Sequence, residues 1–307
     1  MRSAAAPPPL DAESVRKLLQ SGGGLPSVPA VVTSVLTLLE NPRASFAEVG
    51  RAISMDQALT AKVLKLVNSA YYGFPREIAT VTHALILLGL DTVKDLVVTA
   101  SVMKEFSADS LAAFDPEAFW LHSLGCAVAT KAVAEHLRYR ASGEAFAAGV
   151  LHDIGKLLLA RHYPDLTELC VHNAKEERLS MRQAELGVIG VDHAEVGGWL
   201  AEAWNFPPAM AAAIRYHHRP LAASEEDSGL VAMVHIGNVV VRRAGFGDGG
   251  GGDRAEVDAE LLKSKTGHKL RLHQLAVDEV VAELPGRMEG AQAFLRVLDV
   301  GKDEKGK

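Results

Sequence analysis

The residues with the clearest chemical potential are the adjacent pair His152 and Asp153, inside the apolar segment 149–156, GVLHDIGK. Burying an imidazole and a carboxylate costs free energy unless partners satisfy both groups. Both are common ligands of divalent Zn, Mn or Fe, so metal coordination would satisfy the pair together. On its own, the pair could also lie on the surface of a helix.

Further metal-ligand candidates occur at other points of the chain, each in a different expected helix or helix end. Helical bundles build metal sites from inward-facing side chains of several helices, so such a distribution favours a shared centre. The additional candidates are His122, His193, His217, His218 and Asn238. His235, one turn before Asn238, is a candidate metal ligand or a residue that contacts a ligand without binding the metal itself.

The composition predicts that helices position these side chains. Hydrophobic residues make up 48% of the chain, charged residues 23% and aromatic residues only 6%, with Ala and Leu abundant. Strands usually draw on β-branched and aromatic residues, whereas Ala and Leu favour helices. We therefore expect an all-α fold.

Apolar spacing, caps and breakers divide the chain into short helices. One helix is expected to follow Ser45, because Glu48 three residues later completes a capping box. The other expected helices cover residues 11–20, 30–40, 56–68, 80–88, 91–106, 116–136, 143–162, 181–186, 194–204, 210–217, 229–244, 256–267, 275–284 and 288–300.

The segments between and beyond these helices suggest the domain limits. We expect a flexible arm at 1–24, an ordered domain at 25–244, C-terminal helices at 255–300 and a disordered tail at 301–307. The glycine-rich segment 245–254 predicts a surface loop that serves as a linker. It follows no strand and lacks the Lys-Ser/Thr of a phosphate-binding loop.

Charge and cysteine content exclude several classes of protein. A net charge of −6 without a basic tract argues against an extended nucleic-acid surface. No run of about 18 apolar residues predicts a membrane span, and the first residues do not resemble a signal peptide. Cys126 and Cys170 offer neither a disulfide framework nor a CxxC motif, so both are expected to be small buried residues. Together these features predict a cytoplasmic protein.

Several motifs resemble those of one family. They are LPSVP at 25–29, the D-x-x-L-x-x-x-L-x-x-x-N-S pattern with its continuation at 56–73, A-I-x-x-L-G-like residues at 82–89, and Glu185 followed by GVDHAEVG at 190–197. The order His, His-Asp, His, His-His and a last Asp-like position is that of the HD superfamily. From about residue 25 to 244 the chain resembles HDOD-domain proteins, a mostly regulatory branch of the HD metal-dependent phosphohydrolases.

The resemblance implies an HD-type helical bundle with an N-terminal helical lobe at 25–110 and a metal-binding lobe at 111–244. It implies a mono- or dinuclear centre, with Fe or Mn favoured and Zn, Ni or Mg open, in which Asp153 could bridge two ions. In a hydrolytic member, Asp153 and Lys156 would be catalytic; Lys156 meets a substrate phosphate or is simply a solvated lysine. The implied ligands are His122, His152, Asp153 and His193, with one or both of His217 and His218, and Asn238 as the last position.

Two departures from hydrolytic relatives weaken the expectation of catalysis. Asn238 stands where those enzymes usually carry Asp, and the change removes negative charge that would hold the metal and orient its water. Residues 217–222 read HHRPLA, whereas cyclic-dinucleotide phosphodiesterases of the HD-GYP type carry HHExxDGxGYP. Metal binding is therefore better supported than hydrolysis.

The sequence is consistent with two main functions and with one further alternative. The first is a signalling or regulatory module that senses a nucleotide-type ligand or binds a partner protein, in which the N-terminal lobe faces the partner. The second is an active phosphohydrolase or phosphodiesterase on a nucleotide, in which water activated by the metal attacks and Lys156 steadies the phosphoryl charge. The third is a scaffold in which the histidines are fortuitous.

Overall fold

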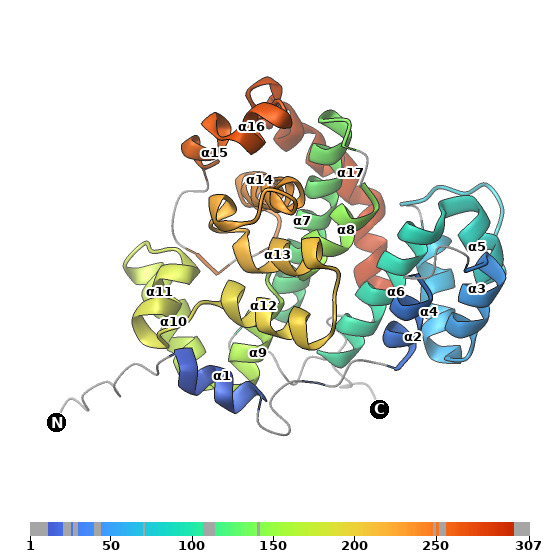
Figure 1. Ribbon diagram of the computed structural model, residues 1–307, viewed down its shortest axis with the longest axis horizontal. Helices are drawn as coiled ribbons and strands as arrows, with labels where there is room; N and C mark the ends of the chain where they lie inside the picture. The colour runs from blue at the N-terminus through green and yellow to red at the C-terminus, as the bar shows by residue number, and fades with distance from the viewer. Residues whose placement is uncertain are drawn as a thin grey trace.

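The computed structural model describes residues 12–20, 26, 30–39, 44–69, 71–106, 114–139, 142–247, 250–251 and 256–297. Within these ranges the chain forms helices joined by turns and contains no strand, which confirms the all-α expectation (Figure 1). The expected disordered tail at 301–307 and most of the expected N-terminal arm lie outside the described residues.

The first group of helices forms a lobe of its own at one side of the molecule (Figure 1). The expected capping box begins one of these helices: the Ser45 amide donates to Glu48 Oε2 at 2.8 Å, and the Glu48 amide donates to Ser45 Oγ at 3.3 Å. Each helix contributes buried aliphatic side chains to the lobe's interior. The helices are α2 (Ala30–Leu39), α3 (Phe46–Ser54), α4 (Gln57–Val67), α5 (Val81–Leu88) and α6 (Leu90–Glu105).

The second group surrounds the candidate ligands, with α7, α8 and α14 packed together at its centre. Trp199 and Trp204 are buried in the core. Cys126 and Cys170 are also buried and free, as the sequence predicts. The helices are α7 (Pro116–His136), α8 (Ser142–Leu151), α9 (Ile154–His162), α10 (Pro164–Glu176), α11 (Met181–Val188), α12 (His193–Ala203), α13 (Pro208–Tyr216) and α14 (Ser228–Ala244).

The expected single helix over 143–162 is wrong, because the chain turns between α8 and α9. His152 and Asp153 occupy that turn, and Asp153 precedes the first residue of α9. The apolar pattern runs on through the break, so helical spacing alone could not reveal it. The break matters for function because it releases both side chains from the helix surface.

The sequence pattern also missed α10. Its buried residues are Thr167, Cys170 and Ala174. These are small side chains at spacings of three and four, and they give a weaker amphipathic signal than Leu or Val would. Its first residue is Pro164, a position that proline suits because its fixed φ already matches a helix.

The C-terminal helices differ from expectation in two places. The expected helix 256–267 is split into α15 (Ala259–Lys263) and α16 (Lys265–Lys269), because Ser264 Oγ accepts from the Gly267 amide at 3.0 Å and caps a new start. The two helices expected over 275–284 and 288–300 are one helix, α17 (Val277–Val297), which continues through Pro285. Buried residues on both sides of the proline hold its two halves on one surface.

Helix α17 joins the two groups of helices. It packs against α7 and α14 and also contacts α4, and in Figure 1 it passes between the two groups. Arg287 Nη1 pairs with Glu135 of α7 at 2.9 Å on the exposed side of this packing. At the other end of the chain, α1 (Ala12–Gln20) buries Val15 and places the Arg16 guanidinium over the Trp199 ring. Among the described helices, none is both long and apolar enough to span a bilayer.

Candidate metal centre

The sequence-predicted site residues come together in one buried centre built from five places in the second group of helices. His122 lies on α7, His152 and Asp153 lie in the α8–α9 turn, and His193 is the first residue of α12. His217 and His218 follow α13, and Asn238 lies on α14. All of them are buried except His218, which is partly exposed.

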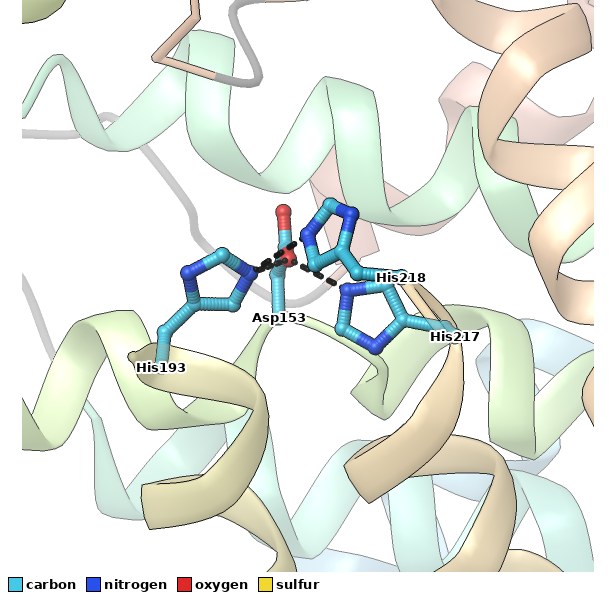
Figure 2. A group of neighbouring side chains, drawn as sticks. All are labelled: Asp153, His193, His217 and His218. Carbon is cyan, nitrogen blue, oxygen red and sulfur yellow. Dashed lines mark hydrogen bonds and ion pairs between the residues drawn. The ribbon is translucent and has the colours of Figure 1, made fainter. Parts of the chain in front are cut away.

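The Asp153 carboxylate lies at the middle of the group (Figure 2). Its Oδ1 is 3.1 Å from His193 Nε2 and 3.5 Å from His217 Nε2. Its Oδ2 is 3.3 Å from His152 Nε2 and 3.6 Å from His122 Nε2. The carboxylate therefore faces two histidines on each side.

Three of these rings are held in a fixed tautomer by acceptors behind them. His152 Nδ1 lies 2.8 Å from the Gly149 carbonyl, and His217 Nδ1 lies 2.8 Å from the Ile214 carbonyl. A carbonyl only accepts, so each Nδ1 must carry the proton and donate it. His193 Nδ1 donates in the same way to the Glu185 carboxylate. In a neutral ring each Nε2 then presents a lone pair to the centre.

Lone pairs that face a carboxylate, or one another, repel unless a cation or a proton lies between them. His193 Nε2 and His218 Nε2 are only 3.0 Å apart. Several buried atoms at the centre lack a hydrogen-bond partner among the described residues: both ring nitrogens of His122, Nε2 of His152 and His217, Oδ1 of Asp153 and Oδ1 of Asn238. Buried polar atoms without partners are rare, and a divalent metal would satisfy the atoms of this set that face Asp153. The residues therefore fit a metal.

Two overlapping groups of ligand atoms could hold ions. One consists of Asp153, His193, His217 and His218, and the other of His122, His152 and Asp153. Asp153 belongs to both. The geometry thus offers the mono- or dinuclear arrangement that the sequence resemblance implies.

Burial and neighbouring charges shift the pKa values of these groups. Burial lowers the pKa of His217 to about 4 and the pKa of His218 well below its ordinary range, which favours neutral rings. At His152 and His193 the neighbouring carboxylates outweigh burial and raise the pKa values to about 10 and about 9, so these rings share protons with the carboxylates when no metal is bound. Burial opposes ionisation of Asp153, but His152, Lys156 and His193 together hold the pKa of its carboxyl well below the usual value. Asp153 is therefore the anion of the centre.

Glu185 is a further residue of the candidate site, which the sequence motif contained but to which residue spacing assigned no role. Its buried carboxylate accepts from the His193 amide at 2.8 Å as well as from Nδ1. Asp192 caps the start of α12, where His193 is the first residue, by accepting from the Glu195 amide at 2.9 Å. Carboxylates behind a ligating histidine fix its ring and raise its basicity. In the sequence, Glu185 stands eight positions before His193 in the same motif, and this placement was the signal that could have identified it.

His235 supports the centre and does not enter it. Its Nδ1 donates to the His217 carbonyl at 2.8 Å, and its Nε2 accepts from the Asp258 amide at 3.1 Å. Both ring nitrogens are therefore engaged. The ring ties the backbone of His217 to the segment before α15.

The described part of the glycine-rich segment covers the centre, although the sequence predicts a functionless linker there. A Cβ on Gly247 would collide with the carbonyl of Ala118 and the amide of His122, and Gly247 has a φ of 68°. Gly251 lines a cavity of only about 10 Å³ beside the ligands, about the space of one water molecule. The cavity's other lining residues are His122, Lys156, Ser180, Met181, His193, His218, Asn238 and Arg242.

Known proteins resemble this chain in sequence and in fold. The model of the HDOD domain matches residues 25–220, more than half of the chain. An uncharacterised protein from Treponema pallidum is 27% identical over 222 residues, which are 71% of this chain and 42% of the relative. The chain thus spans less than half the length of that relative.

Solved structures agree. An HDOD domain protein of unknown function from Geobacter sulfurreducens is 27% identical, with a TM-score of 0.72 over 92% of this chain and 96% of that one. A candidate phosphohydrolase from Shewanella amazonensis shares the fold at 24% identity, with a TM-score of 0.70 over 92% and 97% of the two chains. A candidate signal transduction protein from Marinobacter aquaeolei shares it at 21% identity, with a TM-score of 0.72 over 92% and 64%. By its matched domain, this chain belongs to the HDOD family.

Proposed function

We propose that this chain is a metal-binding regulatory protein that senses a nucleotide-type ligand or binds a partner protein through its HDOD domain. The observation that carries the proposal is the buried convergence of histidine Nε2 atoms on Asp153, three of them held in the ligating tautomer from behind. When bound, a divalent metal would supply positive charge and Lewis acidity at this point. We favour Fe or Mn, with Zn, Ni or Mg as alternatives.

Regulation is favoured over turnover by the surroundings of the centre. Asn238 supplies a neutral amide at the last ligand position, so the centre has less negative charge to hold a metal and orient its water than an aspartate there would give. In the proposed role, the N-terminal helices present a surface to the partner, and occupancy of the centre changes how the two groups of helices pack. The free, buried cysteines fit action in a reducing cytoplasm.

Metal content tests the proposal directly. We expect the purified protein to retain a transition metal measurable by inductively coupled plasma mass spectrometry, and His152→Ala to lose metal and melt at a lower temperature. His172→Ala, on the exposed side of α10, is the matched control and should change neither quantity. Absence of metal from the wild type, with an unaltered melting curve for His152→Ala, would reject the metal centre and favour a scaffold.

The second candidate function is a metal-dependent phosphohydrolase or phosphodiesterase acting on a nucleotide. The specific observation in its favour is the near-complete ligand set with Lys156 beside Asp153. In that role Asp153 would hold the reacting centre and Lys156 would meet the phosphoryl charge. The hydrogen-bond acceptors behind the histidine rings would orient those rings in this role as in the regulatory one.

A panel of nucleotides and cyclic dinucleotides, offered with Fe or Mn, separates the two functions. Phosphate or nucleotide release that Asp153→Ala abolishes would establish the enzyme. Binding without turnover, measured by calorimetry on the same panel, would support the sensor.

A further inference from the structure

We infer that the Lys156 ammonium takes the place of a second metal ion. The centre would then hold a single divalent ion, bound by Asp153 Oδ1 together with His193, His217 and His218. The inference rests on the metal binding proposed above and specifies the number and position of the ions. It separates two halves of the centre that share Asp153: the Oδ1 half, with His193, His217 and His218, and the Oδ2 half, with His122 and His152.

Lys156 already occupies the Oδ2 half. Its Nζ donates to Asp153 Oδ2 at 2.6 Å, and its side chain is only 4% exposed. The backbone holds it there, because the Lys156 amide donates to the Asp153 carbonyl at 2.9 Å in the first turn of α9. Metal–carboxylate bonds are about 2.0–2.2 Å long, so an ion on the same oxygen would lie against the ammonium. Two cations in contact repel strongly in a buried site.

The charges around the Oδ2 half do not offset a second ion. Asp153 is the one carboxylate that touches it among the described residues, and Lys156 already pairs with that group. Glu185 faces His193 in the other half, and Asn238 is neutral. In the Oδ2 half, the Lys156 ammonium therefore offsets the Asp153 charge.

The Oδ1 half has the opposite character. Asp153 Oδ1 has no hydrogen-bond partner among the described residues, and Nε2 of His193 and His217 face it at 3.1 and 3.5 Å. His218 Nε2 lies 3.0 Å from His193 Nε2, so two rings face the same point (Figure 2). Three imidazole nitrogens and one carboxylate oxygen would make a four-ligand set for one divalent ion.

Single-ligand variants locate the ion. We expect His218→Ala to lose at least tenfold in metal affinity, measured by competition with a chelator. We expect His122→Ala, from the Oδ2 half, to keep one bound ion with an affinity within about threefold of the wild type. The reverse order of effects would overturn the assignment to the Oδ1 half.

Metal stoichiometry tests the role of the lysine. The protein is loaded with Mn²⁺, and the ratio of metal to protein is measured for the wild type, Lys156→Met, Asn238→Asp and the double variant, with Lys104→Met on the exposed face of α6 as control. We expect a ratio of one for the wild type and the control, and two for the double variant. Electron paramagnetic resonance should show an isolated Mn²⁺ ion in the wild type and in the control, and a coupled pair of ions in the double variant.

The outcomes separate this inference from the proposed function. A wild-type ratio of zero rejects the metal centre itself. A wild-type ratio of two, or a ratio of one that persists in a folded double variant, overturns the role assigned to Lys156. If Lys156→Met does not fold, the wild-type ratio and spectrum decide the number of ions, and the two histidine variants decide the position.

Discussion

At the scale of single residues, the centre depends on which nitrogen of each histidine carries its proton. Acceptors behind His152, His193 and His217 hold the proton on Nδ1 and aim Nε2 at Asp153. Two acceptors are backbone carbonyls of the helices that precede the ligands, three residues earlier in each case. The third is Glu185, so this carboxylate is the acceptor that a substitution can remove.

Glu185→Gln is expected to lower metal affinity about 10- to 100-fold, because the amide keeps an acceptor but no longer raises the basicity of His193. The measurement is competition with a chromogenic chelator at fixed pH. Glu176→Gln, at the exposed end of α10, is the matched control and should bind metal like the wild type. Equal affinity for Glu185→Gln and wild type would show that the carboxylate does not tune the ligand.

A second residue-scale prediction concerns Asp95, a buried carboxyl on α6 whose Oδ1 lacks a hydrogen-bond partner among the described residues. Burial raises its pKa well above the ordinary value of 3.8, against the opposing effect of Lys94. The folded state therefore holds this proton more tightly than the unfolded state. Stability falls as pH rises from about 4 through the folded-state pKa.

Asp95→Asn removes this penalty and should be more stable than the wild type at pH 7, with the difference disappearing near pH 4. Urea unfolding across that pH range measures the effect. Asp91→Asn, exposed in the first turn of the same helix, should not stabilise the protein at pH 7. A gap between Asp95→Asn and wild type that does not depend on pH would contradict the titration.

At the scale of elements, the close approach of α9 and α12 brings Asp153 next to His193. A Cβ on Gly155 would collide with the carbonyl of His193 and lie 2.7 Å from the amide nitrogen of Gly197. Both neighbours are backbone atoms, which cannot rotate aside. The two helices can touch at this level because residue 155 has no side chain.

Gly155→Ala is therefore expected to push α9 and α12 apart. The free energy of unfolding should fall by about 1–3 kcal/mol, and metal affinity should fall as well. Thermal unfolding and the chelator assay measure the two effects. Gly187→Ala is the matched control, because a Cβ there meets nothing within 4 Å on α11; it should be neutral or stabilise by up to about 1 kcal/mol. Normal metal affinity in Gly155→Ala would show that the helices accommodate the methyl group.

At the scale of the whole molecule, α17 connects the N-terminal helices to the metal-bearing helices. It contacts α4 on one side and α7 and α14 on the other, and buries Leu284 completely. An element that packs on both groups couples their unfolding. The C-terminal helices are thus part of the folded body.

Leu284→Ala should lower the free energy of unfolding by about 2–5 kcal/mol, the usual cost of a cavity at a fully buried leucine. Glu289→Ala, exposed on the same helix, is the control and should change stability by less than about 0.5 kcal/mol. Urea unfolding followed by tryptophan fluorescence and by helicity should give coincident transitions for the control. Two separated transitions in the control would show that the two groups of helices unfold independently.

The sequence by itself determined the helical class, the Ser45 capping box, the burial of the cysteines and the family. These follow from local spacing, capping chemistry and motif order, which need no knowledge of distant contacts. It also named the histidines and Asp153 as candidate ligands, because their residue types carry the chemistry.

Only the tertiary structure decided how those residues act. The turn at His152 and Asp153 is hidden by an apolar pattern that continues across it, and the continuity of α17 through Pro285 depends on the surfaces on which it packs. The acceptors that set each histidine tautomer, and the ammonium on Asp153 Oδ2, arise from distances that spacing along the chain does not specify. Ligand identity is a property of residue type, whereas ligand geometry and local charge balance are properties of the packed fold.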